Sequence, residues 1–442
     1  MRRAVLAMPF LSTVGCSSGG EPVVSDIDGS TSMPTADTGS SLPSSLPIID
    51  LDPDGPYAVP DSSGYLEYGE AVAVGLDLDR DGRQEWAVST PNHPTLGTYN
   101  TPVAIYEGRE LLHTFRPMER EGASSAYQAR FLAGGGDTDG DGFGELLIPE
   151  EWNGFGTYVR VIRSLDASED ILLFAPDDLA WTPQNVGFQR VEGIDQPLLL
   201  SANPGSWRLD RFDLSAAEPG TTLVAGEDTR VFWEEPLDGK EPGQPLFADL
   251  DGNSSEELVI GRHRSDNETG TTWICPGELG LEVPDDCETL TPGLSAGRFH
   301  EVGDLDGDGD LDIIAVASAI AGDDGEVWFL TAEGEVLAHL QGTRGNSLGS
   351  YPTYVVDDDG EAWVILAEFN SYSSEPTHAY RFRVADLVGE LTEADAETVW
   401  RTPGTSIGRQ SAVYRETPDS PLQLILTEPY HDNGYVYLLP WP

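Results

Sequence analysis

The sequence predicts an all-β protein, a seven-bladed β-propeller with four-stranded antiparallel blades. Three observations predict this fold. Short apolar or alternating runs, typical of strands, recur in units of roughly 56 residues. No segment places apolar residues at the 3.6-residue period of an amphipathic helix. The 442 residues include 49 glycines and 32 prolines, which suits many short strands joined by tight turns.

An acidic loop marks four of the seven units, and the loops begin at residues 77, 137, 249 and 304. The steps between these starts are 60, 112 and 55 residues, so the middle step spans two units, one of which lacks the loop. Within each loop, oxygen-bearing side chains occupy positions 1, 3, 5 and 9. A strand-like apolar run follows, such as Leu146-Leu147-Ile148.

These loops are candidate metal sites. The residue at position 7 is counted among the candidate ligands of each loop. We number the loops by the blade to which they belong. Loop 1 contains Asp77, Asp79, Asp81, Arg83 and Glu85; loop 2 contains Asp137, Asp139, Asp141, Phe143 and Glu145; loop 4 contains Asp249, Asp251, Asn253, Ser255 and Glu257; loop 5 contains Asp304, Asp306, Asp308, Asp310 and Asp312. Alternate residues can turn their oxygens around one hard cation, and a long, flexible oxygen-only loop favours Ca²⁺ over Mg²⁺.

The sequence therefore predicts about four structural calcium sites and no organic cofactor. Loop 4 is the least acidic, because it has Asn253 and Ser255, and is expected to bind most weakly. An EF-hand is excluded, because it needs flanking helices and a bidentate glutamate at position 12. Position 12 is occupied here by Val88, Ile148, Ile260 and Ala315. Aspartate-rich hairpin turns that bind no metal are the alternative.

Three further units have strands without the full acidic pattern. In the third unit, Val191–Pro197 leads into the run Leu198-Leu199-Leu200, and in the sixth, Tyr354–Gly360 leads into Trp363–Leu366. The seventh unit runs out of chain after three strands. Because an open propeller leaves an unpaired edge, we expect a strand from residues 46–66 to complete the seventh blade. The candidates are Leu46–Leu51 and Pro56–Val59.

A short glycine-containing segment precedes the first strand of several units. These segments are Tyr68-Gly69, Val186-Gly187-Phe188, Leu294–Arg298, Ser347–Tyr351 and Ser406–Gln410. With the four acidic loops, they make residues 56–442 resemble FG-GAP or VCBS repeat proteins, whose propeller is that of integrin α-subunit heads. The phenylalanine of the family signature is replaced. The resemblance implies that the loops bind calcium and support the blades, and that the propeller faces bind ligands.

The N-terminus resembles a bacterial lipoprotein signal. Arg2-Arg3 precede a short apolar run, and Thr13-Val14-Gly15-Cys16 follows, with Thr13 where the usual motif has leucine. Residues 1–16 are therefore expected to be a signal peptide with Cys16 lipidated; an ordinary secretory signal is the alternative. Residues 17–55, rich in Ser, Pro, Gly and Asp, predict a disordered tether. Ser17 is not an inner-membrane retention residue, so the expected location is the outer membrane of a bacterial envelope.

The chain has 24 basic and 77 acidic residues, a formal charge of -53. Such a surface repels nucleic acid and anionic lipid, so membrane contact is expected only through the lipid anchor. Export favours a disulfide between Cys275 and Cys287.

We therefore expect a monomeric, non-catalytic binding, adhesion or assembly module for an envelope or extracellular protein or glycan. The alternative is a polysaccharide hydrolase or lyase that uses carboxylates on a propeller face, although no catalytic residues can be assigned. A purely structural surface-layer role is a third possibility.

Overall fold

The computed structural model describes most of residues 46–442. The gaps fall at 53, 57, 60–67, 91–101, 118–125, 129–130, 153–155, 176–181, 192, 203–205, 226–227, 237–240, 244, 264–270, 278–286, 291–296, 298, 318–323, 344–346, 369–375, 403–409 and 430–433. The chain divides into two units, Met1–Gly39 and Ser40–Pro442. The predicted signal peptide, Cys16 and residues 17–45 of the predicted tether lie outside the described residues. In the described part, no helix is both long and apolar enough to span a membrane.

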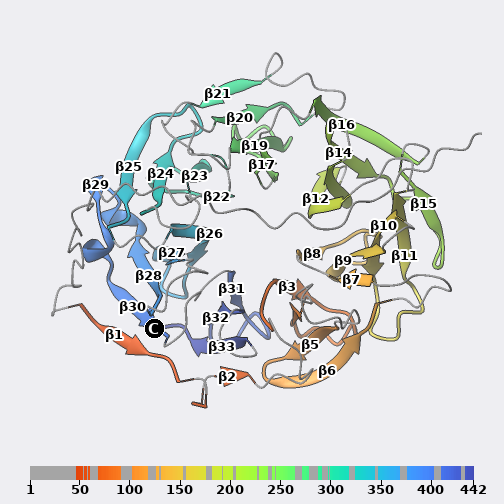
Figure 1. Cartoon of the computed structure of the whole chain (residues 1–442), viewed down its shortest axis with the longest axis horizontal. Helices are drawn as coiled ribbons and strands as arrows, with labels where there is room; N and C mark the ends of the chain where they lie inside the picture. The colour runs from red at the N-terminus through yellow and green to blue at the C-terminus, as the bar shows by residue number, and fades with distance from the viewer. Residues whose placement is uncertain are drawn as a thin grey trace, which may run out of the picture. The chain divides into compact units, whose positions relative to one another are not determined.

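The unit Ser40–Pro442 is all-β and forms a seven-bladed β-propeller, each blade a mainly antiparallel sheet (Figure 1). In blade 1 the strands are β3 (Val72–Leu76), β4 (Glu85–Ser89), β5 (Val103–Glu107) and β6 (Glu110–Phe115). In blade 2 they are β7 (Ala126–Gln128), β8 (Ala133–Gly136), β9 (Glu145–Trp152), β10 (Gly156–Ile162) and β11 (Ile171–Ala175). In blade 3 they are β12 (Thr182–Val191), β13 (Ile194–Ala202), β14 (Ser206–Phe212) and β16 (Thr229–Pro236).

The remaining blades repeat this plan. In blade 4 the strands are β17 (Glu241–Pro242), β18 (Leu246–Ala248), β19 (Glu257–His263), β20 (Thr271–Cys275) and β21 (Glu288–Leu290). In blade 5 they are β22 (Phe299–Gly303), β23 (Asp312–Ala317), β24 (Glu326–Leu330) and β25 (Val336–Gln341). In blade 6 they are β26 (Leu348–Val356), β27 (Ala362–Glu368), β28 (His378–Arg383) and β30 (Thr398–Arg401). In blade 7 they are β31 (Ser411–Tyr414), β32 (Gln423–Glu428), β33 (Tyr435–Pro440) and β2 (Ala58–Val59).

The ring of blades is closed. Each innermost strand contacts the innermost strand of the next blade, in the circular order β3, β8, β12, β18, β22, β26, β31 and back to β3. The predicted closure of the last blade is confirmed, because β2 pairs antiparallel with β33 and supplies the outer strand of blade 7. Of the two candidate stretches, Pro56–Val59 therefore closes blade 7.

The other stretch has a different partner. Strand β1 (Ile48–Asp50) pairs in parallel with β30, the outer strand of blade 6, and Arg401 Nε donates to Asp50 Oδ1 at 2.6 Å. The described sheet structure thus begins within residues 17–55, the range assigned to the tether by sequence.

Two more short strands also pair in parallel with the outer strand of the preceding blade. Strand β15 (Thr222–Val224) leaves blade 3 and pairs in parallel with β11 of blade 2. Strand β29 (Gly389–Leu391), between the 3₁₀ turns Val384–Asp386 and Glu393–Asp395, leaves blade 6 and pairs in parallel with β25 of blade 5. Strand β1 comes directly before β2, the outer strand of blade 7, and so belongs to the segment of blade 7. The blades whose segments supply a strand to the preceding blade are therefore blades 3, 6 and 7, which are the three without a full acidic loop.

The hydrophobic core lies between the blades. The second strand of each blade reads as a continuous apolar run because both of its faces are buried. In β9, Leu146 and Ile148 pack in a cluster with residues of blade 1, whereas Leu147 packs with residues of blade 3. All three side chains are fully buried. Blade 2 therefore buries apolar side chains against both of its neighbours.

The third unit differs from the expectation for its loop. Residues 191–197 were expected to connect two strands, but Val191 and Ile194 are paired across a tight turn, and β13 runs through Ala202. Gly193 occupies the left-handed region in this turn, with a φ of 88°. A two-residue connection has no room for a nine-residue ligand ladder.

Candidate metal centre

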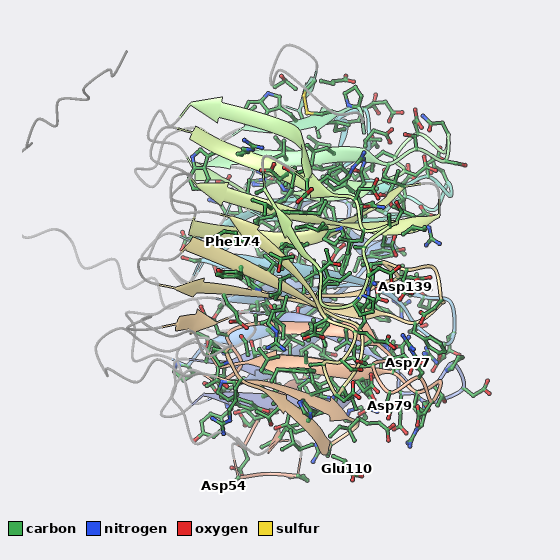
Figure 2. All side chains as sticks on the ribbon, turned by 90° about the vertical axis from the view of Figure 1, so that its right-hand side faces the viewer. Asp54, Asp77, Asp79, Glu110, Asp139 and Phe174 are labelled. Atoms are coloured by element: carbon green, nitrogen blue, oxygen red, sulfur yellow. A yellow bond between two sulfur atoms is a disulfide. The ribbon has the colours of Figure 1, made fainter. Side chains whose placement is uncertain are left out.

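The four acidic loops connect the first and second strands of blades 1, 2, 4 and 5, so all four emerge on the same face of the propeller. Figure 2 shows Asp77, Asp79 and Asp139 together at one edge of the sheets, with Phe174 toward the opposite edge. In each loop, three or four carboxylates each offer an oxygen within 4.8 Å of the others. These groups are Asp77, Asp79 and Glu85; Asp137, Asp139, Asp141 and Glu145; Asp249, Asp251 and Glu257; and Asp304, Asp306 and Asp308.

One hydrogen-bond pattern holds all four loops. At position 9, Glu85 accepts from the backbone N–H of Leu78 at 2.8 Å, and the other loops repeat this bond at 2.5 to 2.8 Å. At position 1, Asp77 Oδ2 accepts from the N–H of Gly82 at 3.2 Å, with equivalents at 2.8 to 3.1 Å. The position 3 and position 5 side chains each accept from the N–H two residues on, at 2.7 to 3.2 Å.

These bonds curl the backbone so that the alternate side chains converge. The residues at position 7 take part in this hydrogen-bond pattern through their backbone N–H groups; they are Arg83, Phe143, Ser255 and Asp310. In loop 5, the group of converging carboxylates found among the described residues includes neither Asp310 nor the position 9 residue Asp312.

The curl requires left-handed backbone at positions 4 and 6. Position 6 has φ of 83° at Gly82, 89° at Gly142 and 98° at Gly309, and a Cβ added at these glycines would meet nothing within 4 Å. Glycine is therefore favoured for its backbone freedom and not for lack of space. Two side-chain-bearing residues adopt the same region, Arg80 at 59° and Ser254 at 70°.

Several carboxylate oxygens in these loops have no hydrogen-bond partner although they are buried. They are Asp77 Oδ1 and Glu85 Oε1 in loop 1, and Asp249 Oδ1 in loop 4. The Glu85 side chain is fully buried. A buried, unsatisfied acceptor costs roughly 1–3 kcal/mol. Since these oxygens have no donor and belong to carboxylates grouped within 4.8 Å of one another, a hard cation is the partner that fits the groups.

The pKa values of the loop carboxyl groups also favour a bound cation. Burial, with added repulsion from neighbouring aspartates, raises the pKa of Glu85 and of Glu145 to about 8. Burial, with Asp306 and Asp308 nearby, raises the pKa of Asp312 to about 6. Without a cation, the carboxyl groups of Glu85 and Glu145 are favoured in the protonated state at neutral pH, and that of Asp312 is favoured in the protonated state only below about pH 6. A divalent cation among the oxygens would reverse that preference.

In blades 6 and 7, protein donors bond to acceptors in the connection between the first and second strands. In blade 6, the Asp357 carboxylate accepts from the N–H groups of Asp359 and Glu361, at 3.0 and 2.9 Å, and from the indole N–H of Trp363 at 2.8 Å. In blade 7, Arg415 donates to the Ser420 carbonyl at 2.9 Å.

A second group of buried carboxylates lies near the opposite ends of the sheets. In blade 6, Glu368 accepts from the Tyr380 hydroxyl at 2.5 Å and lies 3.0 Å from His378 Nδ1. In blade 7, Glu428 accepts from the Tyr437 hydroxyl at 3.0 Å.

A glutamate occupies the same strand position in blade 2, where Glu150 Oε1 lies 3.5 Å from Arg160 Nη1. In all three blades the partner side chain lies on the third strand and is paired with a residue of the second strand, and the glutamate comes two residues after that paired residue. Glu150 therefore occupies the same position as Glu368 and Glu428. Each of the three glutamates is at most 1% exposed. Repetition and burial are typical of a bond that fastens the second strand to the third.

Cys275 and Cys287 are joined by a disulfide that connects the end of β20 to the start of β21 in blade 4. Cys275 is fully buried, and both sulfurs lie in the cluster between blades 3 and 4.

Sequence reasoning missed three residues that bear on the loops. Arg80 occupies position 4, where the other loops have glycine, and Thr138 occupies position 2, where the others have leucine. Arg163 lies in the connection after β10 and donates to Thr138. A departure from the pattern shared by the four loops was the available signal for Arg80 and Thr138, whereas nothing local marked Arg163.

Fold and loops together define a class of protein, a seven-bladed β-propeller with four acidic loops on one face. No family model matches the chain, and no curated protein matches it.

Among solved structures, the chain is similar to one described as the Dos1 propeller, with 10% identity and a TM-score of 0.45, over 85% of this chain and 86% of that one. It is also similar to an endo-arabinase from Bacteroides thetaiotaomicron VPI-5482, with 13% identity and a TM-score of 0.30, over 56% of this chain and 89% of that one.

Proposed function

We propose that this chain is a non-catalytic, calcium-stabilised propeller of a bacterial envelope that binds an envelope or extracellular protein or glycan. The observation that carries the proposal is the fourfold repetition of one ligand-like loop, with buried oxygens in two copies that have no donor. In this proposal, loops 1, 2, 4 and 5 each hold one Ca²⁺, and the ions brace the connections between the first two strands.

The buried glutamates support the absence of catalysis in this proposal. A general acid or base must reach its substrate within hydrogen-bond distance. Glu368 and His378, the described pair most like an acid–base pair, are 1% and 3% exposed, and the glutamate position recurs in two other blades. We assign both residues a structural role.

Sequence supports the location and the kind of partner. Arg2-Arg3, the apolar run and Cys16 favour export and lipid anchoring, and the formal charge of -53 disfavours nucleic acid. A propeller held on a tether by its N-terminus leaves its faces available for binding, as in the repeat proteins that the sequence resembles.

The proposal is tested first by metal content. Purified chain dialysed against calcium buffer and then passed through metal-free buffer is expected to retain up to four calcium ions by elemental analysis. A variant with Asp77→Asn, Asp137→Asn, Asp249→Asn and Asp304→Asn should retain fewer. Absence of calcium from the unaltered chain at millimolar free calcium would refute the metal part of the proposal.

Catalysis is tested separately. The calcium-loaded chain is incubated with a panel of envelope and plant polysaccharides, and both retained glycan and released reducing or unsaturated ends are measured. Binding without release supports the proposal. Release of ends by the unaltered chain would establish the alternative enzyme, and loss of that release in Glu368→Gln, at an unchanged melting temperature, would assign Glu368 to it.

A further inference from the structure

Loop 2 differs from the other acidic loops in its surroundings. Its position 2 is Thr138, whose hydroxyl accepts from Arg163 Nε at 3.1 Å and from Arg163 Nη2 at 2.9 Å. Arg163 is 6% exposed, and its Nε lies 3.9 Å from Asp139 Oδ2. A buried, always-charged guanidinium is therefore fixed beside a position 3 carboxylate.

A second arginine reaches loop 2 from the neighbouring blade. Arg80 belongs to loop 1, and its Nη2 lies 3.1 Å from Asp141 Oδ2 and 2.6 Å from Glu169 Oε2. Its guanidinium carbon also lies 5.9 Å from the centre of the Phe143 ring, at position 7 of loop 2. The Arg80 side chain is 36% exposed, so solvent screens this pair only in part.

Loop 5 provides the contrast within the same molecule. It has five aspartates, and within the described residues no ion pair joins any of them to a basic side chain. The two loops share the same backbone hydrogen bonds, so they differ mainly in charge.

We propose that Arg80 and Arg163 act as internal counter-ions of loop 2 and make it the weakest and most readily exchanged of the four calcium sites. This inference rests on the proposed calcium binding and adds an order of filling: loop 5 fills first, and loop 2 fills last. It also replaces the expectation that loop 4, the least acidic loop, is the weakest.

The physical reason is competition for the same oxygens. The Arg80 guanidinium must give up Asp141 Oδ2, or share it, before that oxygen can contact a cation. A single positive charge a few ångströms from a divalent ion also weakens binding about tenfold even in water-like screening. Because Arg80 belongs to loop 1, its backbone is set by the fold of loop 1. Loop 2 is thereby sensitive to the state of loop 1.

The test is hydrogen exchange by mass spectrometry on the full chain across a series of buffered free calcium concentrations. Peptides that cover residues 77–85, 137–145, 249–257 and 304–312 each give a midpoint for calcium protection. In the unaltered chain, the midpoint of loop 2 is expected at calcium at least tenfold above that of loop 5. Arg80→Gln should lower the loop 2 midpoint about tenfold and leave loop 5 unchanged.

Two variants make the test specific. Arg383→Gln is the matched control: it removes the same charge from a side chain that is 40% exposed, in blade 6, and should move no loop midpoint. The double change Thr138→Leu with Arg163→Met restores the leucine that the other loops carry and should lower the loop 2 midpoint further. If this double variant fails to fold, the Arg80→Gln comparison decides alone.

Three outcomes overturn the inference. They are protection of loop 2 at or below the calcium midpoint of loop 5, an unchanged loop 2 midpoint in Arg80→Gln, and an equal shift in Arg383→Gln. Each of these leaves calcium binding itself in place. Failure of every loop to gain protection at any calcium concentration would instead remove the proposed function, and the inference with it.

Discussion

Replacing Glu85 by glutamine is expected to have opposite effects with and without calcium. Glu85 is fully buried; one of its oxygens accepts from the Leu78 N–H at 2.8 Å, and the other has no partner. The amide keeps the acceptor for Leu78 and removes the charge. With calcium, the variant loses a charged ligand and should be less stable. With a chelator at high pH, it loses a buried, repelled charge and should be more stable.

The pH dependence follows from the raised pKa. Burial, reinforced by Asp79, Asp77 and Asp81, raises the pKa of Glu85 from 4.5 to about 8 in the metal-free fold. A raised carboxyl pKa contributes stability that is fully present below pH 4.5 and is lost as pH rises through about 8. The glutamine variant has no such titration. Its advantage over the metal-free parent should therefore be absent near pH 4 and grow up to about pH 9.

Both effects are large enough to measure. Relief of one buried unsatisfied charge contributes roughly 1–3 kcal/mol, and a tenfold loss of calcium affinity corresponds to about 1.4 kcal/mol. With an unfolding entropy of about 2.1 cal/mol/K per residue, the roughly 400 residues of the unit Ser40–Pro442 give a slope near 0.8 kcal/mol per degree. Each effect should thus shift the melting temperature by about 2 °C, in opposite directions.

The assay is differential scanning fluorimetry at pH 5, 7 and 9, in calcium and in chelator. Glu361→Gln is the control, because this glutamate is 50% exposed in the blade 6 connection and should show no change of sign. An equal loss of stability for Glu85→Gln in both conditions at pH 9 would mean that Glu85 acts as a structural acceptor and not as a metal ligand.

Three further changes test the rest of the structure. Gly142→Ala should cost about 1 kcal/mol in chemical denaturation, purely from its φ of 89°, since an added Cβ meets nothing within 4 Å; a loss above 3 kcal/mol would contradict this. Tyr437→Phe removes a donor from the buried Glu428 carboxylate and should cost about 1–3 kcal/mol, whereas no loss would mean that this bond does not fasten blade 7. Replacing both Cys275 and Cys287 by alanine should cost about 3 kcal/mol, because the bridge closes a short loop, and reduction should have no effect on that variant.

Most of the fold could be predicted from local sequence patterns. A strand buried on both faces must be apolar at every position, so runs such as Leu146-Leu147-Ile148 were visible before any blade was placed. The alternate acids of the four loops are equally local, because their curl depends on hydrogen bonds between residues two to seven apart. The seven units and the closing role of the N-terminal segment follow from counting these patterns.

Assignments across blades needed the tertiary structure. Strands β1, β15 and β29 have three residues each, too few to show a period, and each pairs in parallel with an edge that exists only after the preceding blade has formed. The contact of Arg80 with Asp141 is likewise set by how blades 1 and 2 pack.

The sequence by itself determined where the blades and acidic loops lie, because those depend on neighbours along the chain. The tertiary structure alone decided which blades supply a strand to the preceding blade and which loop has two arginines beside it. Those features depend on edges and charges that meet only when the ring closes.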